Sequence, residues 1–294
     1  MSSGRGDLSR LYKTTDGGRT WKLLFANPDS DGSWSGLQFE PGAGRELGRV
    51  GYIAGDPVHG WFADFITYDY GDLWSPVGPG VGSLGKAKAG ETIFASSNSA
   101  LTLIRNAPVI VTGGAVSRLR EASLHVKHDP QIFYEFVGGV IPLQHSESAG
   151  AFSFAARLGP DSLAGPDVAK FIEKPTHSGD VLVVVGGDFR KPDASESTAA
   201  SSTDGGMTWS PPITPPRGYR FSVAYDKPHN AWITVGPNGT DISNDDGRNW
   251  RPLRSKPGTR DPSDADQQWN ALSLPFVVGP HGRIGKFKDV ALTH

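Results

Sequence analysis

The chain of 294 residues contains no cysteine. This absence excludes disulfides, thiolate metal sites and a cysteine nucleophile. An excess of one charge is missing as well, because 29 Lys and Arg residues stand against 31 Asp and Glu residues. Without a basic field to hold a polyanion, nucleic acid is not an expected partner.

Long apolar runs are also lacking. The longest, Val181 to Val185, falls far short of the roughly 20 residues that span a bilayer, so no membrane insertion is expected. The first residues, MSSGRGDLSRLYKTTDGG, lack the apolar core of a signal peptide. The compartment stays open, because many exported proteins also lack cysteine.

Glycine and proline are abundant instead, with 38 and 23 residues. Hydrophobic residues still make up 37% of the chain, enough to build a core. Many short strands joined by many turns explain both numbers. The composition therefore favours an all-β protein.

A short motif recurs along this chain, with the frame Ser/Thr, any residue, Asp, any, Gly, any, Thr/Asn, Trp. The three full copies are TTDGGRTW (Thr14 to Trp21), STDGGMTW (Ser202 to Trp209) and SNDDGRNW (Ser243 to Trp250). A fourth, TYDYGDLW (Thr67 to Trp74), has lost the second hydroxyl or amide. Repetition at this scale predicts a repeat architecture.

Each position of the motif has a physical role in a β-hairpin turn. The Asp carboxylate accepts backbone N–H bonds inside the turn, and the Gly adopts a positive φ without steric cost. The Trp begins the next strand and is expected to bury its ring under the turn. The structural residues of the repeat are Asp16, Trp21, Asp69, Trp74, Asp204, Trp209, Asp245 and Trp250.

These segments resemble Asp-boxes, also called BNR repeats, of the sialidase-like superfamily. Such boxes occur in sialidases, sortilin-type receptors and the photosystem II stability/assembly factor family. The rhythm of box, glycine turn and strand is most similar to the last family and its non-photosynthetic bacterial relatives. The resemblance implies a β-propeller in which each box joins the third and fourth strands of a blade. It also implies exported relatives that bind proteins as scaffolds and have no agreed catalytic residues.

The spacing of the boxes suits blades of four antiparallel strands. Asp204 and Asp245 lie 41 residues apart, and Asp16 and Asp69 lie 53 apart, against roughly 40–50 residues for such a blade. The longer interval after Asp69 leaves room for two blades and an eroded hairpin at Ser123 to Phe136. We expect a single propeller domain over residues 1–294, with five to seven blades.

Strand counting places the two ends of the chain inside blades. LYKTT reads as a third strand and GRIGKFK as another third strand. We therefore expect two strands, then four blades, then three strands, as in a propeller truncated at its N-terminus. The expected ring is open or strained, with residues 11–25 at one edge and residues 283–288 at the other.

Binding residues are expected on the face opposite the boxes, which we call the loop face. The loops between second and third strands, and those between blades, meet there around the central channel. They include GDPVHGWF (Gly55 to Phe62) and GDFRKPD (Gly187 to Asp193). The candidate ligand-binding residues are Trp34, Asp56, His59, Glu91, His145, Glu147, Asp188, Arg190, Lys191, Tyr219, Arg220 and Trp269. No cofactor or metal site is expected.

Each candidate also has a purely structural interpretation. Asp56 and Asp188 follow glycine and could close Asx turns, while Trp34 and Trp269 could belong to the core. The two histidines and the Arg-Lys pair could be solvated loop residues. The sequence alone does not choose between these interpretations.

Two functions remain open. The first is a non-catalytic scaffold, similar to an assembly factor, that binds a protein or peptide on the loop face. The alternative is a glycan-active, sialidase-like hydrolase that uses Asp56, Asp188 or Glu147. Hydrolases of this kind need two carboxylates roughly 5–10 Å apart. The early Phe/Tyr-Arg-Ile-Pro motif of sialidases is absent, since GYRF (Gly218 to Phe221) comes late and lacks Ile-Pro.

Overall fold

A computed structural model describes residues 1–41, 48–78, 83–104, 107–122, 124–125, 133–134, 137–159, 179–254 and 261–288. Within these ranges the regular structure is β-strand, apart from two short 3-10 turns at Gly6–Leu8 and Pro280–Gly282. No helix of the described chain is long and apolar enough to cross a membrane.

The strands form antiparallel sheets that follow one another in chain order. The first sheet consists of β1 (Arg10–Lys13) and β2 (Lys22–Ala26). The second sheet is a meander of β3 (Trp34–Phe39), β4 (Gly51–Val58), β5 (Trp61–Thr67) and β6 (Ser75–Pro76). The third sheet contains β8 (Leu101–Ile104), β9 (Ala107–Val111), β11 (Arg118–Glu121) and β14 (Val137–Val140).

The remaining sheets continue this order. The fourth contains β15 (Ala149–Arg157), β16 (Val181–Asp188) and β17 (Ala199–Ser202), extended by the short strands β10 (Gly113–Gly114) and β7 (Glu91–Thr92). The fifth is a meander of β18 (Ser222–Asp226), β19 (Ala231–Gly236), β20 (Gly239–Ser243) and β21 (Arg251–Pro252). The sixth contains β22 (Ala271–Ser273), β23 (Phe276–Val278) and β24 (Ile284–Lys286).

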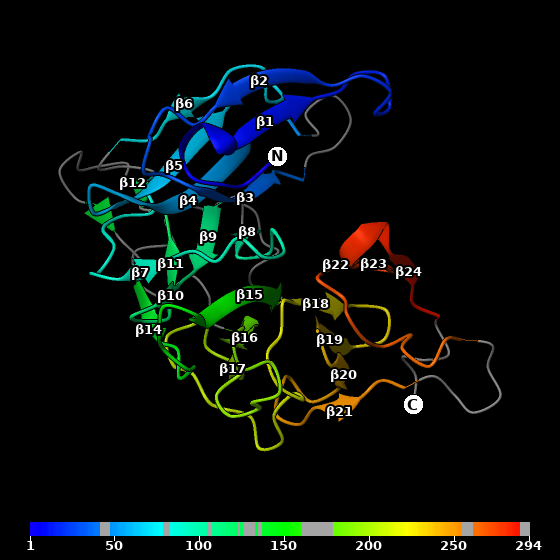
Figure 1. Ribbon diagram of the computed structural model, residues 1–294. Coiled ribbons are helices and arrows are strands. Elements are labelled where there is room, and N and C mark those ends of the chain that lie inside the picture. Colours follow the sequence, from blue (N-terminus) through cyan, green and yellow to red (C-terminus); the bar gives the residue numbers. More distant parts are fainter. Residues whose placement is uncertain are drawn as a thin grey trace.

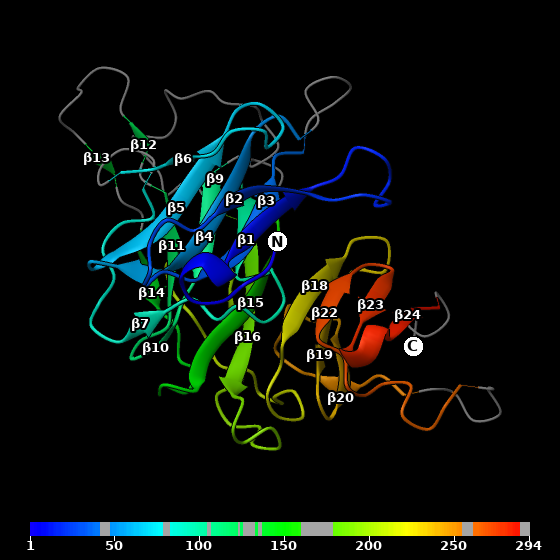
Figure 2. The ribbon, with the colours of Figure 1, turned by 45° about the horizontal axis from the view of Figure 1, so that its top comes forward.

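The sheets are arranged as the blades of a propeller. Figure 1 shows them following one another around a common axis, from the first sheet at the top, past the fourth at the bottom, to the sixth at the right. Figure 2 shows the same succession from a tilted view. The inner strands β3, β8, β15, β18 and β22 contact their neighbours in turn. The predicted fold class, an all-β propeller with four-stranded antiparallel blades, is confirmed.

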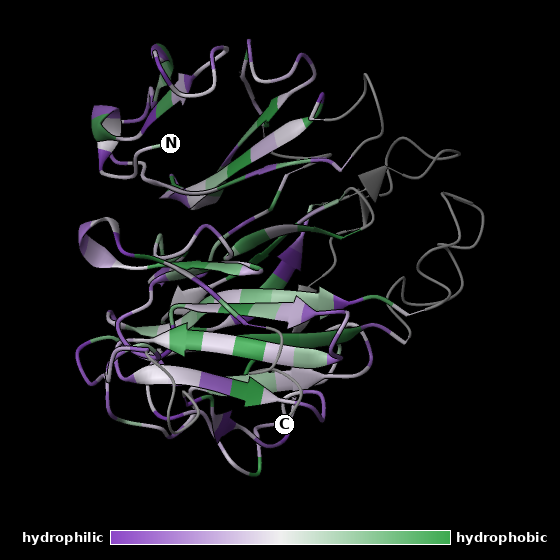
Figure 3. Cartoon of the chain, turned by 90° about the vertical axis from the view of Figure 1, so that its right-hand side faces the viewer, coloured by the Kyte–Doolittle hydropathy of each residue, from purple (hydrophilic) through white to green (hydrophobic). Residues whose placement is uncertain are grey.

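Strand β16 shows why the sequence folds into stacked sheets. All eight of its residues are buried, which requires a covered sheet on both sides. Leu182 and Val184 pack in the core with Leu119 of the third sheet. Val183 and Val185 pack on the other side with residues of the fifth sheet. Hydrophobic residues accordingly concentrate on the strands, while the connecting loops are mostly hydrophilic (Figure 3).

The expected hairpin between the third and fourth strands of the third sheet is present. Strand β12 (Leu124–His125) pairs with β13 (Phe133–Tyr134), within the segment predicted from Ser123 to Phe136. Residues 123, 126–132 and 135–136 of that segment lie outside the described residues. The first and sixth sheets have two and three strands and are separate sheets in the described chain.

The Asp-boxes form the hydrogen bonds that their frame predicts. In one box, Ser202 donates to Asp204 at 2.7 Å and accepts the amide of Gly206 at 2.8 Å. Asp204 also accepts the Thr208 amide at 2.9 Å and its hydroxyl at 2.6 Å. The Trp209 indole donates to the Gly206 carbonyl at 3.1 Å. Each fixed position of the motif therefore takes part in a hydrogen bond within one turn.

The other boxes repeat this pattern. Asp16 and Asp245 accept from the same positions in their own turns. In the degenerate box Leu73 replaces the Thr or Asn, so the side-chain hydrogen bond from this position is missing. The Leu73 amide still donates to Asp69, at 2.9 Å. Hydrogen bonds from the side chain and backbone of Thr20 lower the pKa of Asp16 to about 2. Each of these carboxylates therefore accepts hydrogen bonds from residues of its own turn.

The expected burial of the box tryptophans holds for only part of the set. Trp250 is 4% exposed, Trp74 and Trp209 are half-buried, and Trp21 is 61% exposed. The prediction for Trp21 is therefore wrong. Its indole still donates to the carbonyl of its own turn at 3.1 Å, but burial of a box tryptophan needs a neighbouring sheet that covers it.

Candidate functional site on the loop face

A ladder of short strands crosses the loop face and joins the loops of three sheets. Gly150 of β15 pairs with Gly187 of β16 on one side and with Gly113 of β10 on the other. Gly113 in turn pairs with Thr92 of β7. A Cβ at Gly150 would lie 3.0 Å from the backbone of residue 114, so these strands approach closely because they carry glycine.

Asp56 is tied to the end of this ladder. Its carboxylate accepts a short hydrogen bond from the Thr92 hydroxyl and one from the Ile93 amide at 3.0 Å. Burial raises the pKa of Asp56 above its usual range, although both hydrogen bonds act against the shift. Asp56 therefore fixes the connection between the second and third sheets. Its neighbour His59 lies exposed in the β4–β5 turn with a φ of 53°.

Glu91 is a buried structural residue and not an exposed ligand group. It forms an ion pair with Arg118 at 2.6 Å and accepts the Thr112 hydroxyl, also at 2.6 Å. Burial acts to raise the pKa of Glu91, but the hydrogen bonds from Arg118 and Thr112 outweigh it and the pKa lies below its usual range. The prediction of Glu91 as a ligand contact is corrected by this burial.

Four other predicted residues also belong to the interior, and one of them, Tyr219 at 1% exposed, lies in the aromatic cluster described below. Trp34 is 0% exposed and stacks on Phe25 with ring centroids 5.1 Å apart. Arg220 is 0% exposed and forms a short ion pair with Asp241. Trp269 is 5% exposed and packs in the core of the fifth and sixth sheets. These four residues cannot contact a surface ligand in this conformation, because other side chains already cover them.

The remaining candidates come together around the loop after β16. Asp188 accepts the amide of Arg190 at 3.0 Å, and a hydrogen bond from Ser148 lowers its pKa. The amide of Phe189 donates to the Ser148 carbonyl at 3.1 Å. The segment that holds His145 and Glu147, both exposed, therefore lies beside this loop.

The same loop is anchored to the next sheet. The amide of Tyr219 donates to the Pro192 carbonyl at 2.9 Å. Asn238 donates to the same carbonyl at 3.2 Å. The loop over residues 189–193 is thus held by segments on both sides, so its side chains stand on a fixed backbone.

A cluster of aromatic rings lies under this loop. Phe94 stacks on Phe152 with ring centroids 4.1 Å apart and planes inclined by 3°. Phe152 also meets the edge of Phe189 at 6.3 Å and of Tyr219 at 4.8 Å. Tyr219 in turn meets Phe221 at 4.8 Å. The rings come from the segment after β7, from β15 and from the loops after β16 and before β18.

Part of this cluster reaches the surface. Phe189 is 45% exposed, and Phe94 and Phe221 are half-buried. The Arg190 guanidinium lies 5.9 Å from the centroid of the Phe189 ring, and both Arg190 and Lys191 are exposed. We call these five residues, Phe94, Phe189, Arg190, Lys191 and Phe221, the aromatic-cationic surface.

Sequence reasoning missed the phenylalanines of this surface. The candidates in GDFRKPD were its charged residues, and Phe189, which lies between Asp188 and Arg190, was not among them. The sequence carries no signal for Phe189, because single apolar residues are common on protein surfaces and only the fold shows that its ring joins others in one patch.

Comparison with known proteins adds likeness of fold only. No family model and no curated protein matches the chain. One solved structure, of YCF48 bound to a D1 peptide, is 15% identical, with 96% of this chain and 73% of that chain covered and a TM-score of 0.47. A GH74 enzyme from Niastella koreensis is 12% identical, with 87% and 35% covered and a TM-score of 0.49.

A third structure, a protein of unknown function from Dyadobacter fermentans, is 13% identical, with 94% and 81% covered and a TM-score of 0.46. At these TM-scores the similarities carry no argument about function. This chain is a β-propeller on the evidence of its own sheets, and its repeated turns share one pattern of hydrogen bonds.

Proposed function

We propose that the protein is a binding scaffold that holds a segment of another protein, or a peptide, on its loop face. The aromatic-cationic surface is the observation that carries this proposal. Phe189 exposes 45% of its surface on a loop whose backbone is anchored on both sides. Exposed aromatic and arginine side chains on a rigid frame are typical of residues that dominate binding energy.

The chemistry of the surface indicates what it would hold. The Phe189 ring offers an apolar area, and Arg190 offers a planar fork of N–H donors that suits a carboxylate. Lys191 adds a second cation, since its contact with Asp188 is long, at 4.0 Å. The expected occupant is an extended segment that places an apolar side chain next to an acidic one.

The positions of Asp56 and Asp188 do not favour a hydrolase built on these two carboxylates. Asp188 and Thr92 are separated by three strand spacings in the order β16-β15-β10-β7, which amounts to about 14 Å. Asp56 is bonded to Thr92 and so stands at the far end of this order from Asp188, an arrangement that does not favour the roughly 5–10 Å carboxylate pair of a glycosidase. Both carboxylates are also occupied by hydrogen bonds within the chain.

The test is to pan a library of random peptides displayed on phage against the immobilised protein. Enriched peptides should carry an acidic residue beside an aliphatic or aromatic one. Their affinity should fall about tenfold or more in Phe189→Ser and stay unchanged in Ile213→Ser, a control with 80% exposure outside the aromatic-cationic surface. No enrichment, or equal binding to both variants, would overturn the proposal.

A second arm addresses the hydrolase directly. The protein is incubated with fluorogenic 4-methylumbelliferyl glycosides and sialoside, and with polysaccharides in a reducing-end assay. We expect no release above the buffer blank. Release that disappears in Asp56→Asn or Asp188→Asn would instead establish the glycan-active alternative.

A further inference from the structure

The contact between one sheet and the next is a repeated unit in this protein. In three places an Asp-box rests on the sheet that precedes it. Lys13 of the first sheet reaches the box of the second sheet and pairs with Asp72 at 2.6 Å. The amide of Gly139 in the third sheet donates to the Gly206 carbonyl in the box of the fourth, at 2.9 Å.

The contact between the fourth and fifth sheets shows the unit in full. Arg157 at the end of β15 binds both carboxylate oxygens of Asp246 in the next box, at 2.7 and 2.6 Å. Trp250 of that box packs among the valines of β16, Val183 among them, and is 4% exposed. A Cβ at Gly247 would lie 3.2 Å from Val183. One half of the unit is thus a valine-rich face, and the other half is a box with its tryptophan.

The first sheet presents the box half with nothing against it. Trp21 occupies the position that Trp250 holds in its own box, yet it is 61% exposed. The next strand adds Leu23, which is 48% exposed. A Cβ at Gly18 would meet only the Trp21 ring within 4 Å. The covering contact found in the other boxes is not formed here by the described residues.

The sixth sheet presents the receiving half. Phe276 and Val278 of β23 and Ile284 of β24 are 50%, 42% and 73% exposed. The pairing of Val278 with Ile284, and of Phe276 with Lys286, places all four on one face. Val277 points to the other face and is buried against the fifth sheet. This open face holds the same place in its sheet that Val183 and Val185 hold in β16.

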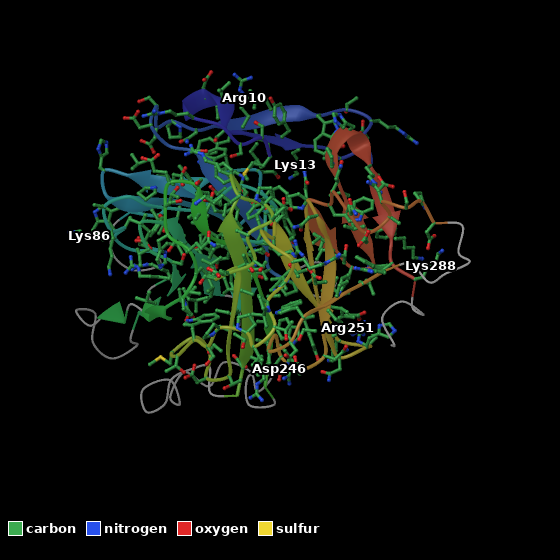
Figure 4. All side chains as sticks on the ribbon, turned by 60° about the horizontal axis from the view of Figure 1, so that its bottom comes forward. Arg10, Lys13, Lys86, Asp246, Arg251 and Lys288 are labelled. Carbon is green, nitrogen blue, oxygen red and sulfur yellow. The ribbon has the colours of Figure 1, made fainter. Side chains whose placement is uncertain are left out.

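We propose that the open face of β23 and β24 in one copy binds the Trp21 box and β2 of a second copy, so that copies associate head to tail. The contact between the fourth and fifth sheets supplies the template, since it joins a box and its tryptophan to the face of the preceding sheet. In Figure 4 the labels of Lys13 and Lys288 mark the first sheet and the end of the sixth. Among the described residues, no strand of the first sheet pairs with a strand of the sixth. A heterologous contact of this kind continues from copy to copy.

Charged residues on the two halves make the association depend on ionic strength. Arg19 of the Trp21 box and Lys286 beside Phe276 are both exposed. Because these cations would approach each other, apolar burial has to drive the association against repulsion. Salt screens such repulsion, so the association should strengthen as ionic strength rises.

Sedimentation velocity over a range of concentrations tests the contact. The wild-type protein should show association that increases with concentration and salt. Trp21→Ser and Ile284→Ser should each weaken it about tenfold or more. The control is Ile213→Ser, which removes an apolar residue of 80% exposure from neither half and should leave association unchanged. A protein that stays monomeric, or an equal loss in the control, would overturn the proposal.

Because the chain has no native cysteine, disulfide trapping can show which residues meet in this contact. Arg19→Cys marks the box half and Lys286→Cys marks the receiving face. Mixed under mild oxidation, the two single variants should form mostly mixed dimers, and the double variant should form a ladder of covalent oligomers. Dimers formed by one single variant with itself would show a different contact and contradict the head-to-tail assignment. A double variant whose disulfide forms only within one chain would contradict it as well.

Discussion

Asp64 is a buried acid that helps to hold the connection between the second and third sheets. It lies in β5 with 8% of its surface exposed, and its carboxylate accepts the Leu84 amide at 2.8 Å. The carbonyl of Leu84 accepts two hydrogen bonds from Arg120, at 2.9 and 2.8 Å. Burial raises the pKa of Asp64 to about 7, and burial lowers the pKa of Arg120 to about 10.

The raised pKa of Asp64 predicts a pH dependence of stability. Its ordinary value is 3.8 and its folded value is about 7, so between these pH values the folded state binds more protons than the unfolded state. The free energy of unfolding should therefore fall as pH rises through this window. Asp64→Asn removes the titration, and its stability relative to wild type should rise by up to about 4 kcal/mol from pH 4 to pH 8.

Urea denaturation across that pH range measures the effect. The control is Asp29→Asn, a substitution of a residue outside the buried set, which should leave the shape of the wild-type profile intact. Parallel profiles for wild type and Asp64→Asn would contradict a raised pKa in the folded state.

The box tryptophans provide a second prediction for single residues. Trp250→Ala removes a ring that is 4% exposed and should cost about 3–5 kcal/mol of unfolding free energy. Trp21→Ala removes a ring that is 61% exposed and should cost less than about 1 kcal/mol. Chemical denaturation of both variants compares them, and equal losses would contradict the difference in burial.

These residues also show what a local pattern can and cannot predict. The hydrogen bonds of Asp16 and Asp204 follow from the motif, because every partner lies within a few residues in the same turn. The burial of Trp21 does not, because it depends on a different sheet. Trp34 and Arg220 were candidate ligands only because a sequence does not show which side chains the fold covers.

At the scale of elements, the box turn is shaped both by its own backbone and by the sheet beneath it. Gly206 and Gly18 occupy the same box position, with φ values of +93° and +87°. A Cβ at Gly206 would lie 2.8 Å from Leu119 of the third sheet, whereas Gly18 has no neighbour closer than 3.8 Å. The two glycines thus share a strained conformation and differ in their contact.

This pair predicts the strength of the contact between sheets. Gly18→Ala should cost about 1 kcal/mol, from backbone strain alone. Gly206→Ala should cost about 2–4 kcal/mol, because overlap with a packed leucine is added to the same strain. Thermal and urea unfolding of the two variants measure the difference. Equal costs would show that the turn does not press on the third sheet.

Long strands could be predicted from the sequence, and the shortest strands could not. β16 and β19 are continuous apolar runs, and the hairpins follow from glycine turns and boxes. The two-residue strands β7 and β10 were not predictable, since two residues carry no periodicity. Yet these short strands join the loops of three sheets and set the separation of Asp56 from Asp188.

At the scale of the whole molecule, the propeller separates its structural turns from its loop face. Within the second sheet, Asp56 lies near the β4–β5 turn, and the box of Asp69 lies at the opposite end of β5. The fourth sheet repeats this arrangement with Asp188 and the box of Asp204. Binding on the loop face, as proposed, would therefore leave undisturbed the boxes at the opposite ends of these sheets.

Hydrogen–deuterium exchange with a selected peptide tests the central claim, that the loop face binds a protein segment, most directly. The peptide should slow exchange in residues 144–150 and 187–193, which carry and flank the aromatic-cationic surface, and leave the box over residues 202–209 unchanged. Protection of the box turns instead, or no protection in either loop at saturating peptide, would contradict the account.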